Sequence, residues 1–246
     1  MQVVVTYNDN TVVHYNNFNK ITNNINVIEI DCGMNHLISL PDNMNFPNLM
    51  YFYCNNNNLK SLPCNMNFPN LTHFKCYNNY LTSLPDNMTS KMRFPNLTHF
   101  NCSMNHLTSL PTNMTFPNLT YFSCHNNNLK SLPCNMKLPN LTYFSCHNNN
   151  LKSLPCNMKL PNLTHFDCGN NNLTSLPDNM NFPNLAHFYC HNNKLTSLPD
   201  NMILPNLTQF HCSNNKLYYI PPHINCHISK DDMTKSPEYM RRKLWI

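Results

Sequence analysis

The chain has 246 residues, of which 41% are hydrophobic and only 11% are charged. Its formal net charge of +5 is modest and no long run of Lys or Arg occurs, so we expect no nucleic-acid partner. It contains no apolar stretch of about 18 residues, the length that marks a membrane span, so we expect no membrane partner either.

Residues 1–26 open with MQVVVTYNDN, which lacks the basic start and long apolar run of a secretory signal. The 13 Cys are therefore expected to stay reduced, in the cytoplasm of the protein's own cell or of a host. Within this segment VVVTY and TVVHY flank Asn8-Asp9-Asn10, a pattern typical of a β-hairpin. We expect a hairpin-like N-terminal cap over 1–26.

Residues 27–221 repeat the frame L-x-x-F-x-C-x-x-N-x-L-x-x-L-P nine times. Successive Cys of this frame are 22 residues apart, except for one step of 26. Residues 119–140 and 141–162 are identical, which favours duplication of a structural unit that is interchangeable with its neighbours. The repeated cysteines are Cys32, Cys54, Cys76, Cys102, Cys124, Cys146, Cys168, Cys190 and Cys212.

This frame resembles the leucine-rich repeat, L-x-x-L-x-L-x-x-N/C-x-L. The resemblance implies an α/β-type solenoid, a horseshoe of nine repeats with a parallel β-sheet on its concave face. On the convex face we expect short extended or 3₁₀ segments and few true helices, because two Pro lie about six residues apart in each unit. The Asn-rich segments LPDNM and FPNLT also resemble repeat proteins of amoeba-infecting giant viruses. We interpret the abundant Asn partly as the background of an A/T-rich genome.

The alternation within each unit predicts which side chains are buried. Phe74 and Cys76 are two residues apart, so both should face the core of a strand while Lys75 faces out. Asn79 should bond backbone groups in the turn after the strand, and its counterparts should form a ladder down the stack. Thr89–Arg93, which lengthen one step, are predicted to bulge from the convex side, where a Met from each unit fills space.

Residues 222–246 depart from the frame and are predicted to form a C-terminal cap with a short helix. Ser236 is suited to the N-cap and Pro237 to the first helical position. This segment also contains Trp245, the single Trp of the chain. A separate peptide-like binding motif is the alternative interpretation.

The outward strand positions form three columns that are rich in Tyr and His. Solenoid curvature creates extended binding surfaces, and Tyr is enriched in protein interfaces, so we predict that a protein partner binds there. The alternative is that these residues are merely tolerated in solvent. The predicted binding residues are Tyr51, Tyr53, His73, Tyr77, His99, Tyr121, His125, Tyr143, His147, His165, His187, Tyr189 and His191.

We predict no catalytic residue, no cofactor and no metal site. Cys-His neighbours such as Cys124-His125 would face opposite sides of a strand, and no C-x₂-C spacing supports zinc, so core Cys are favoured. Cys134 and Cys156 could come within disulfide distance on adjacent coils, but we expect them to remain thiols. The N-x-T triplets recur in register and are interpreted as parts of the turn into each strand.

The sequence therefore predicts a monomeric, non-enzymatic scaffold for protein–protein interaction. The alternative is an adaptor that recruits host enzymes, for example in substrate recognition of the ubiquitin-ligase type, through segment 1–26 or 222–246. A protein without a defined ligand is a further alternative. An enzyme is disfavoured because the chain has no Gly-rich phosphate loop and no G-x-S-x-G motif.

Overall fold

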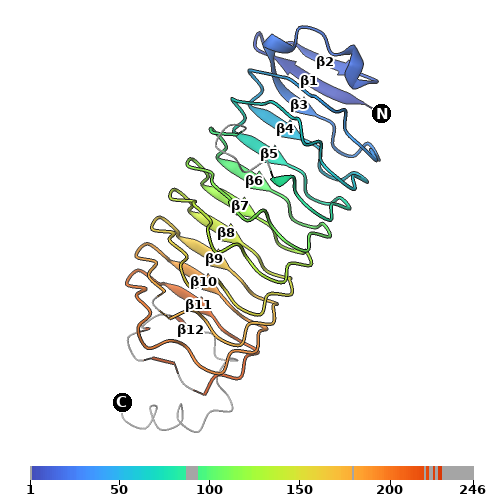
Figure 1. Ribbon diagram of the computed structural model, residues 1–246. Helices are drawn as coiled ribbons and strands as arrows, with labels where there is room; N and C mark the ends of the chain where they lie inside the picture. Colours follow the sequence, from blue (N-terminus) through green and yellow to red (C-terminus); the bar gives the residue numbers. More distant parts are fainter. Residues whose placement is uncertain are drawn as a thin grey trace.

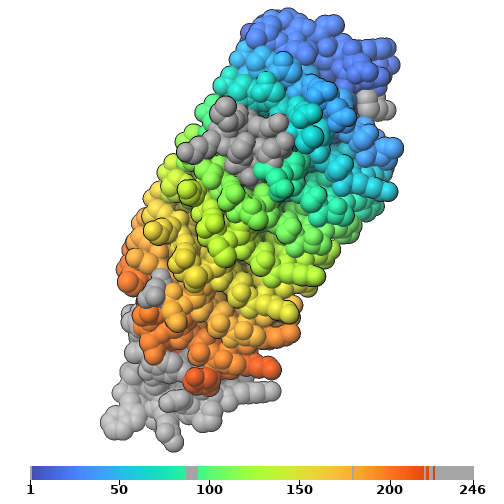
Figure 2. All heavy atoms as spheres, viewed as in Figure 1, coloured from blue at the N-terminus to red at the C-terminus, as the bar shows by residue number. Residues whose placement is uncertain are grey.

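The computed structural model describes residues 2–86, 94–178, 180–218, 220–221, 224 and 227–228. They form an elongated stack in which the strands follow one another side by side from the N-terminus toward the C-terminus (Figure 1). The space-filling view shows successive coils as bands of colour across this column (Figure 2). The predicted bulge at Thr89–Arg93 and the predicted C-terminal helix at Ser236 lie outside the described residues.

The described strands belong to a single 12-stranded sheet in the order β12-β11-β10-β9-β8-β7-β6-β5-β4-β3-β1-β2. From β3 onward each strand pairs in parallel with the next, as a stack of similar coils requires. The fold is therefore a parallel-sheet solenoid, as predicted. Its repeat strands are β3 Val27–Asp31, β4 Tyr51–Tyr53, β5 His73–Lys75, β6 His99–Asn101, β7 Tyr121–Ser123, β8 Tyr143–Ser145, β9 His165–Asp167, β10 His187–Tyr189, β11 Gln209–His211 and β12 His227–Ile228.

A hairpin closes the N-terminal end of the stack. Strands β1 (Val3–Tyr7) and β2 (Val12–Tyr15) are antiparallel, and β1 also pairs antiparallel with β3. The hairpin predicted from the sequence is thus present. Asn35 fastens it to the first coil, because its side chain accepts from Gln2 N at 2.6 Å and donates to Gln2 O at 2.7 Å. The 3₁₀ helices η1 (Phe18–Lys20) and η2 (Asn24–Asn26) complete this segment.

The core confirms the predicted alternation. All nine repeated Cys are buried, with exposed fractions of at most 1%. Beside them runs a column of stacked rings, in which Phe122 and Phe144 have centroids 5.4 Å apart and Phe74 and Phe100 have centroids 5.5 Å apart. Each coil therefore buries its apolar side against the next coil, the arrangement that makes solenoid stability a sum of neighbour interfaces.

The predicted asparagine ladder is also confirmed. Asn127 Nδ2 donates to Cys102 O of the preceding coil at 3.1 Å and to Cys124 O of its own coil at 3.0 Å. Its Oδ1 accepts from Leu107 N of the preceding coil at 2.9 Å. One amide thus satisfies backbone groups of two coils that have no strand partner. The same contacts recur at Asn57, Asn79, Asn105, Asn149, Asn171, Asn193 and Asn215.

Two further sets of Asn have structural roles. The background of an A/T-rich genome therefore accounts for less of the high Asn content than we expected. The residue two after the Cys adopts the left-handed conformation, which Asn tolerates better than most side chains. Another Asn reaches back to a Pro carbonyl of the preceding coil, as Asn140 does to Pro117 O at 2.8 Å. The left-handed positions occupied by Asn are Asn56, Asn78, Asn126, Asn148, Asn170, Asn192 and Asn214.

The side opposite the strands consists of turns and extended segments, joined in places by single parallel bridges such as Asn45–Asn67. The Met residues there fill the interior as predicted, although Met136 and Met158 are only partly buried. The buried members are Met44, Met66, Met114, Met180 and Met202, while Met88 lies outside the described residues. None of the helices in the described ranges has the length and apolar character needed to cross a bilayer.

Candidate partner-binding face

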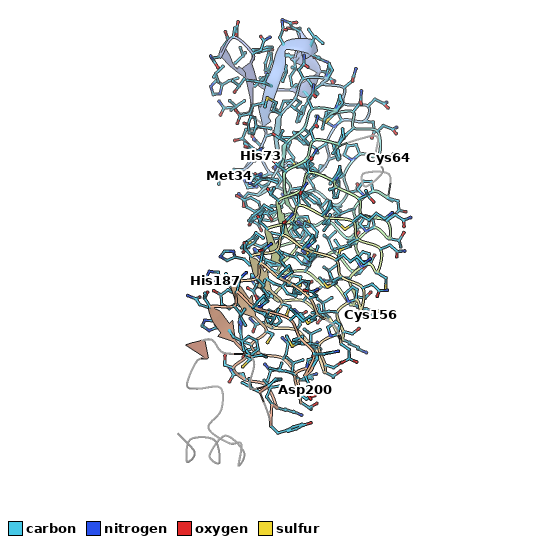
Figure 3. The ribbon with its side chains drawn as sticks, turned by 90° about the vertical axis from the view of Figure 1, so that its left-hand side faces the viewer. Met34, Cys64, His73, Cys156, His187 and Asp200 are labelled. Carbon is cyan, nitrogen blue, oxygen red and sulfur yellow. The ribbon has the colours of Figure 1, made fainter. Side chains whose placement is uncertain are left out.

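Parallel pairing in strict register aligns the predicted binding residues into columns. Tyr121 of β7 lies opposite Tyr143 of β8, and Ser123 opposite Ser145. The third column continues past the strand ends, because Asn126 N donates to His147 O at 3.0 Å. We call the outward residues of these three columns the strand face; His73 and His187 project from it in Figure 3. His99 is exposed, and the other predicted binding residues are partly exposed.

The first column forms a continuous ladder of seven rings across seven strands. Its tightest steps are His73–His99 and His165–His187, each with ring centroids 4.2 Å apart, and Tyr121–Tyr143 at 4.6 Å. Cross-strand ring pairs of this kind stabilise a sheet. The remaining steps are Tyr51–His73 at 4.9 Å, His99–Tyr121 at 5.8 Å and Tyr143–His165 at 6.2 Å.

Threonines orient three of the histidines in this ladder. The Nδ1 atom of His73 lies 2.9 Å from Thr72 Oγ1, and the same distance separates the rings of His99 and His165 from the Thr that precedes each. His187 is preceded by Ala186 instead, and its Nδ1 has no hydrogen-bond partner among the described residues. Sequence reasoning overlooked these Thr–His pairs, although the recurring Thr-His dipeptide was visible.

Burial and neighbouring charge lower the pKa of three of the ladder histidines, His73, His99 and His165. Partial burial lowers the pKa of His73, and His99 and Lys75 lower it further. Burial followed by Lys75 lowers the pKa of His99. The pKa of His165 is lowered by burial and then by His187.

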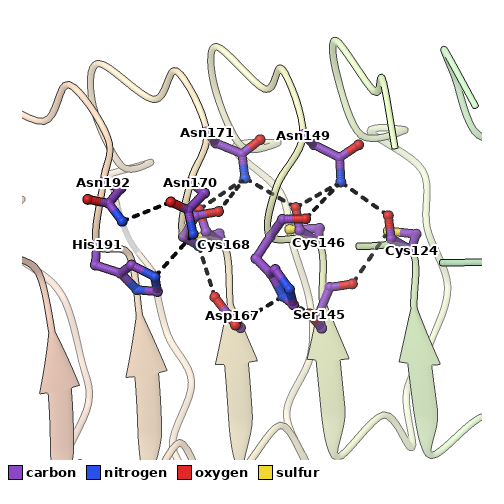
Figure 4. Close-up of polar contacts among 12 residues, drawn as sticks. Cys124, Ser145, Cys146, Asn149, Asp167, Cys168, Asn170, Asn171, His191 and Asn192 are labelled. Carbon is purple, nitrogen blue, oxygen red and sulfur yellow. Dashed lines mark hydrogen bonds and ion pairs between the residues drawn. The ribbon is translucent and has the colours of Figure 1, made fainter. Parts of the chain in front are cut away.

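A polar cluster surrounds His147 of the third column, and Figure 4 labels two of its members, Ser145 and Asp167. His147 Nδ1 lies 3.1 Å from Asp167 Oδ2 and 2.7 Å from Ser145 Oγ. Both contacts use the same ring nitrogen. A catalytic histidine instead takes the proton of a serine on one nitrogen while a carboxylate binds the other. The cluster therefore orients His147 and does not activate Ser145.

His191 occupies space that only Gly169 leaves open. A Cβ atom at position 169 would lie 2.5 Å from a carbon of the His191 ring. The ring also lies 3.3 Å from the amide of Asn170, through its Nε2 atom. The structure thus brings His147 and His191 to either side of Asp167 and Gly169, two residues that were not among the predicted binding residues.

The charged residues of the strand face lie mainly near its N-terminal end. Lys75 Nζ is 4.6 Å from the centroid of the Tyr53 ring, a cation–π contact. Burial, followed by the charge of Glu29, raises the pKa of Tyr53 to about 12, with Asp31 acting in the same direction. In the three columns, the described residues include the carboxylates of Glu29, Asp31 and Asp167 and one ammonium group, that of Lys75.

Adjacent Cys and His residues do face opposite sides. Cys124 is fully buried, whereas His125 is partly exposed on the strand face and stacks on His147 with centroids 4.4 Å apart. Within the described ranges, no group of three or more His, Cys, Asp or Glu side chains is arranged to hold a metal ion. Cys134 and Cys156 are exposed free thiols.

Two grooves occur elsewhere on the molecule. One, of about 600 Å³, follows the residues that precede the strands, including Asn140, Thr142 and Asn162. The other, of about 830 Å³, lies on the side of the turns and is lined by Cys134, Lys137 and Lys159 among others. Both are shallow surface features outside the three columns of the strand face.

Residues 139–181 and 161–201 match the family model described as Leucine Rich repeats (2 copies). No curated protein matches the chain by sequence. Among solved structures, YopM, a leucine-rich effector protein from Yersinia pestis, has a TM-score of 0.63 and 30% identity, over 79% of this chain and 57% of that one.

Two more distant structures share the fold. InlP from Listeria monocytogenes has a TM-score of 0.58 and 22% identity, over 75% of this chain and 54% of that one. A chain of the Toll–Spatzle complex from Drosophila has a TM-score of 0.63 and 19% identity, over 80% and 34%. The chain thus spans just over half the length of YopM and InlP and about a third of the third structure.

Proposed function

We propose that this leucine-rich-repeat solenoid is a non-enzymatic scaffold that binds a protein partner on its strand face, the concave side of the expected horseshoe. Repeat units of one design supply architecture, and function depends on the side chains that they present. Here they present a ladder of seven aromatic rings whose edges remain open to solvent. That ladder is the observation on which the proposal rests.

The physical chemistry of the ladder suits a protein interface. Tyr and His offer large, partly apolar contact area, and their rings are already held by stacking, so little side-chain entropy is lost on binding. The likeness to a chain of the Toll–Spatzle complex supports the proposal by analogy, because that structure contains a bound protein. We propose that the scaffold acts as a monomer in the cytoplasm of its own cell or of a host cell. We also propose that its Asn-rich sequence reflects a viral origin.

No observation favours the adaptor alternative over this proposal. Of the two segments that could recruit an enzyme, the N-terminal one pairs β1 with β3 and closes the stack. Most of residues 222–246 lie outside the described residues. An enzymatic role gains no support from the His147 cluster, because Ser145 and Asp167 contact the same ring nitrogen.

The test is capture of partners from a host lysate by the wild-type chain and by the double variant Tyr121→Ala/Tyr143→Ala. Loss of the central stacked pair should weaken capture of the partner at least about tenfold, since central aromatic residues carry much of the binding energy in interfaces. The circular dichroism spectrum should be unchanged, because both rings are only partly buried.

The matched control is Tyr80→Ala/His106→Ala. It removes another stacked ring pair, with centroids 5.6 Å apart, that lies outside the three columns. It should capture the partner normally. Equal capture by the wild type and both variants would contradict binding at the strand face.

A further inference from the structure

The ring ladder presents edges, not faces, to a partner. The rings of Tyr121 and Tyr143 are nearly parallel, with an angle of 5° between their planes, and those of His73 and His99 are inclined by 10°. In these two pairs each ring therefore covers the facing side of the other. A bound molecule meets the edges, where the polar atoms are the Tyr hydroxyls and the outer nitrogen of each imidazole.

Hydrogen bonds determine which nitrogen of three imidazoles carries the proton. A Thr hydroxyl has one proton, and Thr72 Oγ1 donates it to Met50 O at 2.9 Å. Both contacts of the hydroxyl are satisfied when Thr72 Oγ1 accepts from His73 Nδ1, the arrangement that places the ring proton on Nδ1. The same holds for His99, because Thr98 Oγ1 donates to Thr72 O, and for His165, because Thr164 Oγ1 donates to Thr142 O.

The outer nitrogen Nε2 of these neutral rings is consequently a bare acceptor. His147 has the same tautomer, since its Nδ1 faces the Asp167 carboxylate, which can only accept. Within the described part of the chain, no hydrogen bond reaches Nε2 of His73, His99 or His165. The first column thus offers a row of unpaired lone pairs to whatever binds there.

The charge of the strand face also favours a partner that carries positive charge. Three carboxylates, those of Glu29, Asp31 and Asp167, face one ammonium group, that of Lys75. The strand face is therefore acidic, although the whole chain has a formal net charge of +5. Opposite charge across an interface speeds association and excludes partners of like charge.

We propose that the strand face binds a basic protein segment whose Lys or Arg side chains donate hydrogen bonds to the imidazole Nε2 atoms and to the three carboxylates. This rests on the proposed function and adds the chemical class of the partner. Arg and Lys are donors without an acceptor, so they complement the imidazole lone pairs and the carboxylates of this surface. An acidic segment would meet the same lone pairs without a proton to share.

Acidification should release such a partner. Protonation of an imidazole turns Nε2 from an acceptor into a donor and adds positive charge to the face. The other titratable or charged groups around His73 and His99 are Tyr51, Tyr121 and Lys75, and those around His165 are Tyr143, His187, Asp167 and Tyr189. Of these only Asp167 is anionic, so nothing near the His73–His99 pair offsets the added charge.

The experiment measures binding of a fluorescein-labelled oligo-arginine peptide to the full chain by fluorescence anisotropy, with an oligo-glutamate peptide of equal length beside it. The arginine peptide should bind at about pH 7.5 and lose at least about tenfold in affinity at about pH 5. The glutamate peptide should not bind at either pH. Binding of the glutamate peptide at neutral pH would overturn the proposal.

The decisive variant is Glu29→Gln/Asp31→Asn/Asp167→Asn, which keeps each side-chain shape and an acceptor for the contacts to Thr6, Gly33 and Gly169. It should reduce affinity for the arginine peptide about tenfold or more. The control is Asp178→Asn/Asp200→Asn, two exposed carboxylates outside the columns, which should bind as the wild type does.

Two outcomes separate this inference from the proposed function. If the carboxylate variant and the control bind the arginine peptide equally while Tyr121→Ala/Tyr143→Ala still loses its captured partner, the face binds proteins but not through basic residues. If neither set of strand-face variants changes any binding, both proposals are wrong.

Discussion

Individual side chains of the strand face are held in defined orientations by the residues that precede them. Thr72, Thr98 and Thr164 each bridge a backbone carbonyl of the preceding coil and the Nδ1 atom of the following histidine. The hydroxyl of the preceding Thr therefore decides the tautomer of each of these rings. At position 186 an Ala replaces this Thr, and the ring of His187 lacks the bond.

Replacing Ala186 by Thr should supply that bond. We expect the neutral ring of His187 to shift to the tautomer with the proton on Nδ1, as at His165, because the new hydroxyl proton would be engaged by Thr164 O. Nitrogen chemical shifts of the imidazoles, measured by NMR at a pH where the rings are neutral, report the tautomer directly.

The reverse substitution is the matched control for this prediction. Thr164→Ala should free His165 from its Nδ1–H tautomer and leave His73 and His99 unaffected, since their Thr partners are in other coils. Identical nitrogen shifts for His187 in the wild type and in Ala186→Thr would show that the hydroxyl does not set the tautomer.

At the scale of one coil, the strands are so short that side chains must bond the backbone groups that the sheet leaves without a partner. Most repeat strands span three residues, so much of each coil's backbone lies beyond the sheet. Buried backbone groups without a partner are costly, and the ladder asparagines remove that cost at the point where each strand ends. The identical coils 119–140 and 141–162 show how general the solution is, because Asn127 and Asn149 make equivalent contacts.

Asn127→Ala should lower the free energy of unfolding by about 1–3 kcal/mol, since it leaves carbonyls of two coils and the Leu107 N–H without their partner. Urea denaturation followed by circular dichroism measures the change. Asn128→Ala is the control, because the Asn128 side chain is exposed and should contribute little. An equal loss in the two variants would contradict the role assigned to the ladder.

At the scale of the whole molecule, the coils are nearly interchangeable, but the contacts of their outward side chains differ from coil to coil. The two identical coils differ in contacts that their own residues do not determine. His147 contacts Asp167 of the following coil at 3.1 Å, whereas the coil that follows His125 presents Ser145 at that position, and His125 Nδ1 has no hydrogen-bond partner among the described residues. The residues of the following coil therefore determine which contacts each outward side chain makes.

Deletion of residues 141–162 should preserve the fold and transfer this contact. The register would place coil 119–140 against coil 163–184, so that His125 would face Asp167 and Phe122 would stack on Phe166. We expect cooperative unfolding with a lower free energy, because one coil interface is lost. Urea denaturation and NMR of the His125 ring check the two parts of the prediction.

A deletion of residues 141–151 is the control for modularity. It removes half a coil and breaks the alignment of Cys, Phe and Asn between neighbours, so a cooperative transition should be absent. If both deletions unfold alike, the coils are not interchangeable units.

The stability of the whole molecule should decrease in acid before its carboxylates titrate. Burial is the main cause that lowers the pKa of His73, His99, His125 and His165 in the folded state. Below about pH 6.5, the usual value, the unfolded chain therefore binds more protons than the folded chain. The free energy of unfolding should fall as the pH drops through about 6.5 and level off below the folded-state values.

Urea denaturation at about pH 7.5 and at about pH 5 tests this dependence. Substitution of His99 by Gln should make the decrease smaller, because one titrating ring is removed and the pKa of His73 is no longer lowered by its neighbour. A denaturation midpoint that does not change over this range would contradict the burial of neutral imidazoles.

The sequence alone determined the parts of this protein that depend on periodicity. A Cys every 22 residues implies one inward position per coil, and the parallel register, the buried thiols and the amide ladder all follow from it. A side-chain period of two also placed Tyr and His in outward columns, before their contacts were known. The partner-binding role of those columns remains a prediction, as do the boundaries of the two caps.

The tertiary structure decided what depends on neighbours from different coils. Periodicity shows that His147 faces outward, but the ion pair with Asp167 requires two coils to be superposed at their actual distance. The tautomers of His73, His99 and His165 required the position of a carbonyl that belongs to the preceding coil. The spacing of residues along the chain is visible in the sequence itself. Hydrogen bonds between coils depend on how the coils are stacked, so only the tertiary structure shows them.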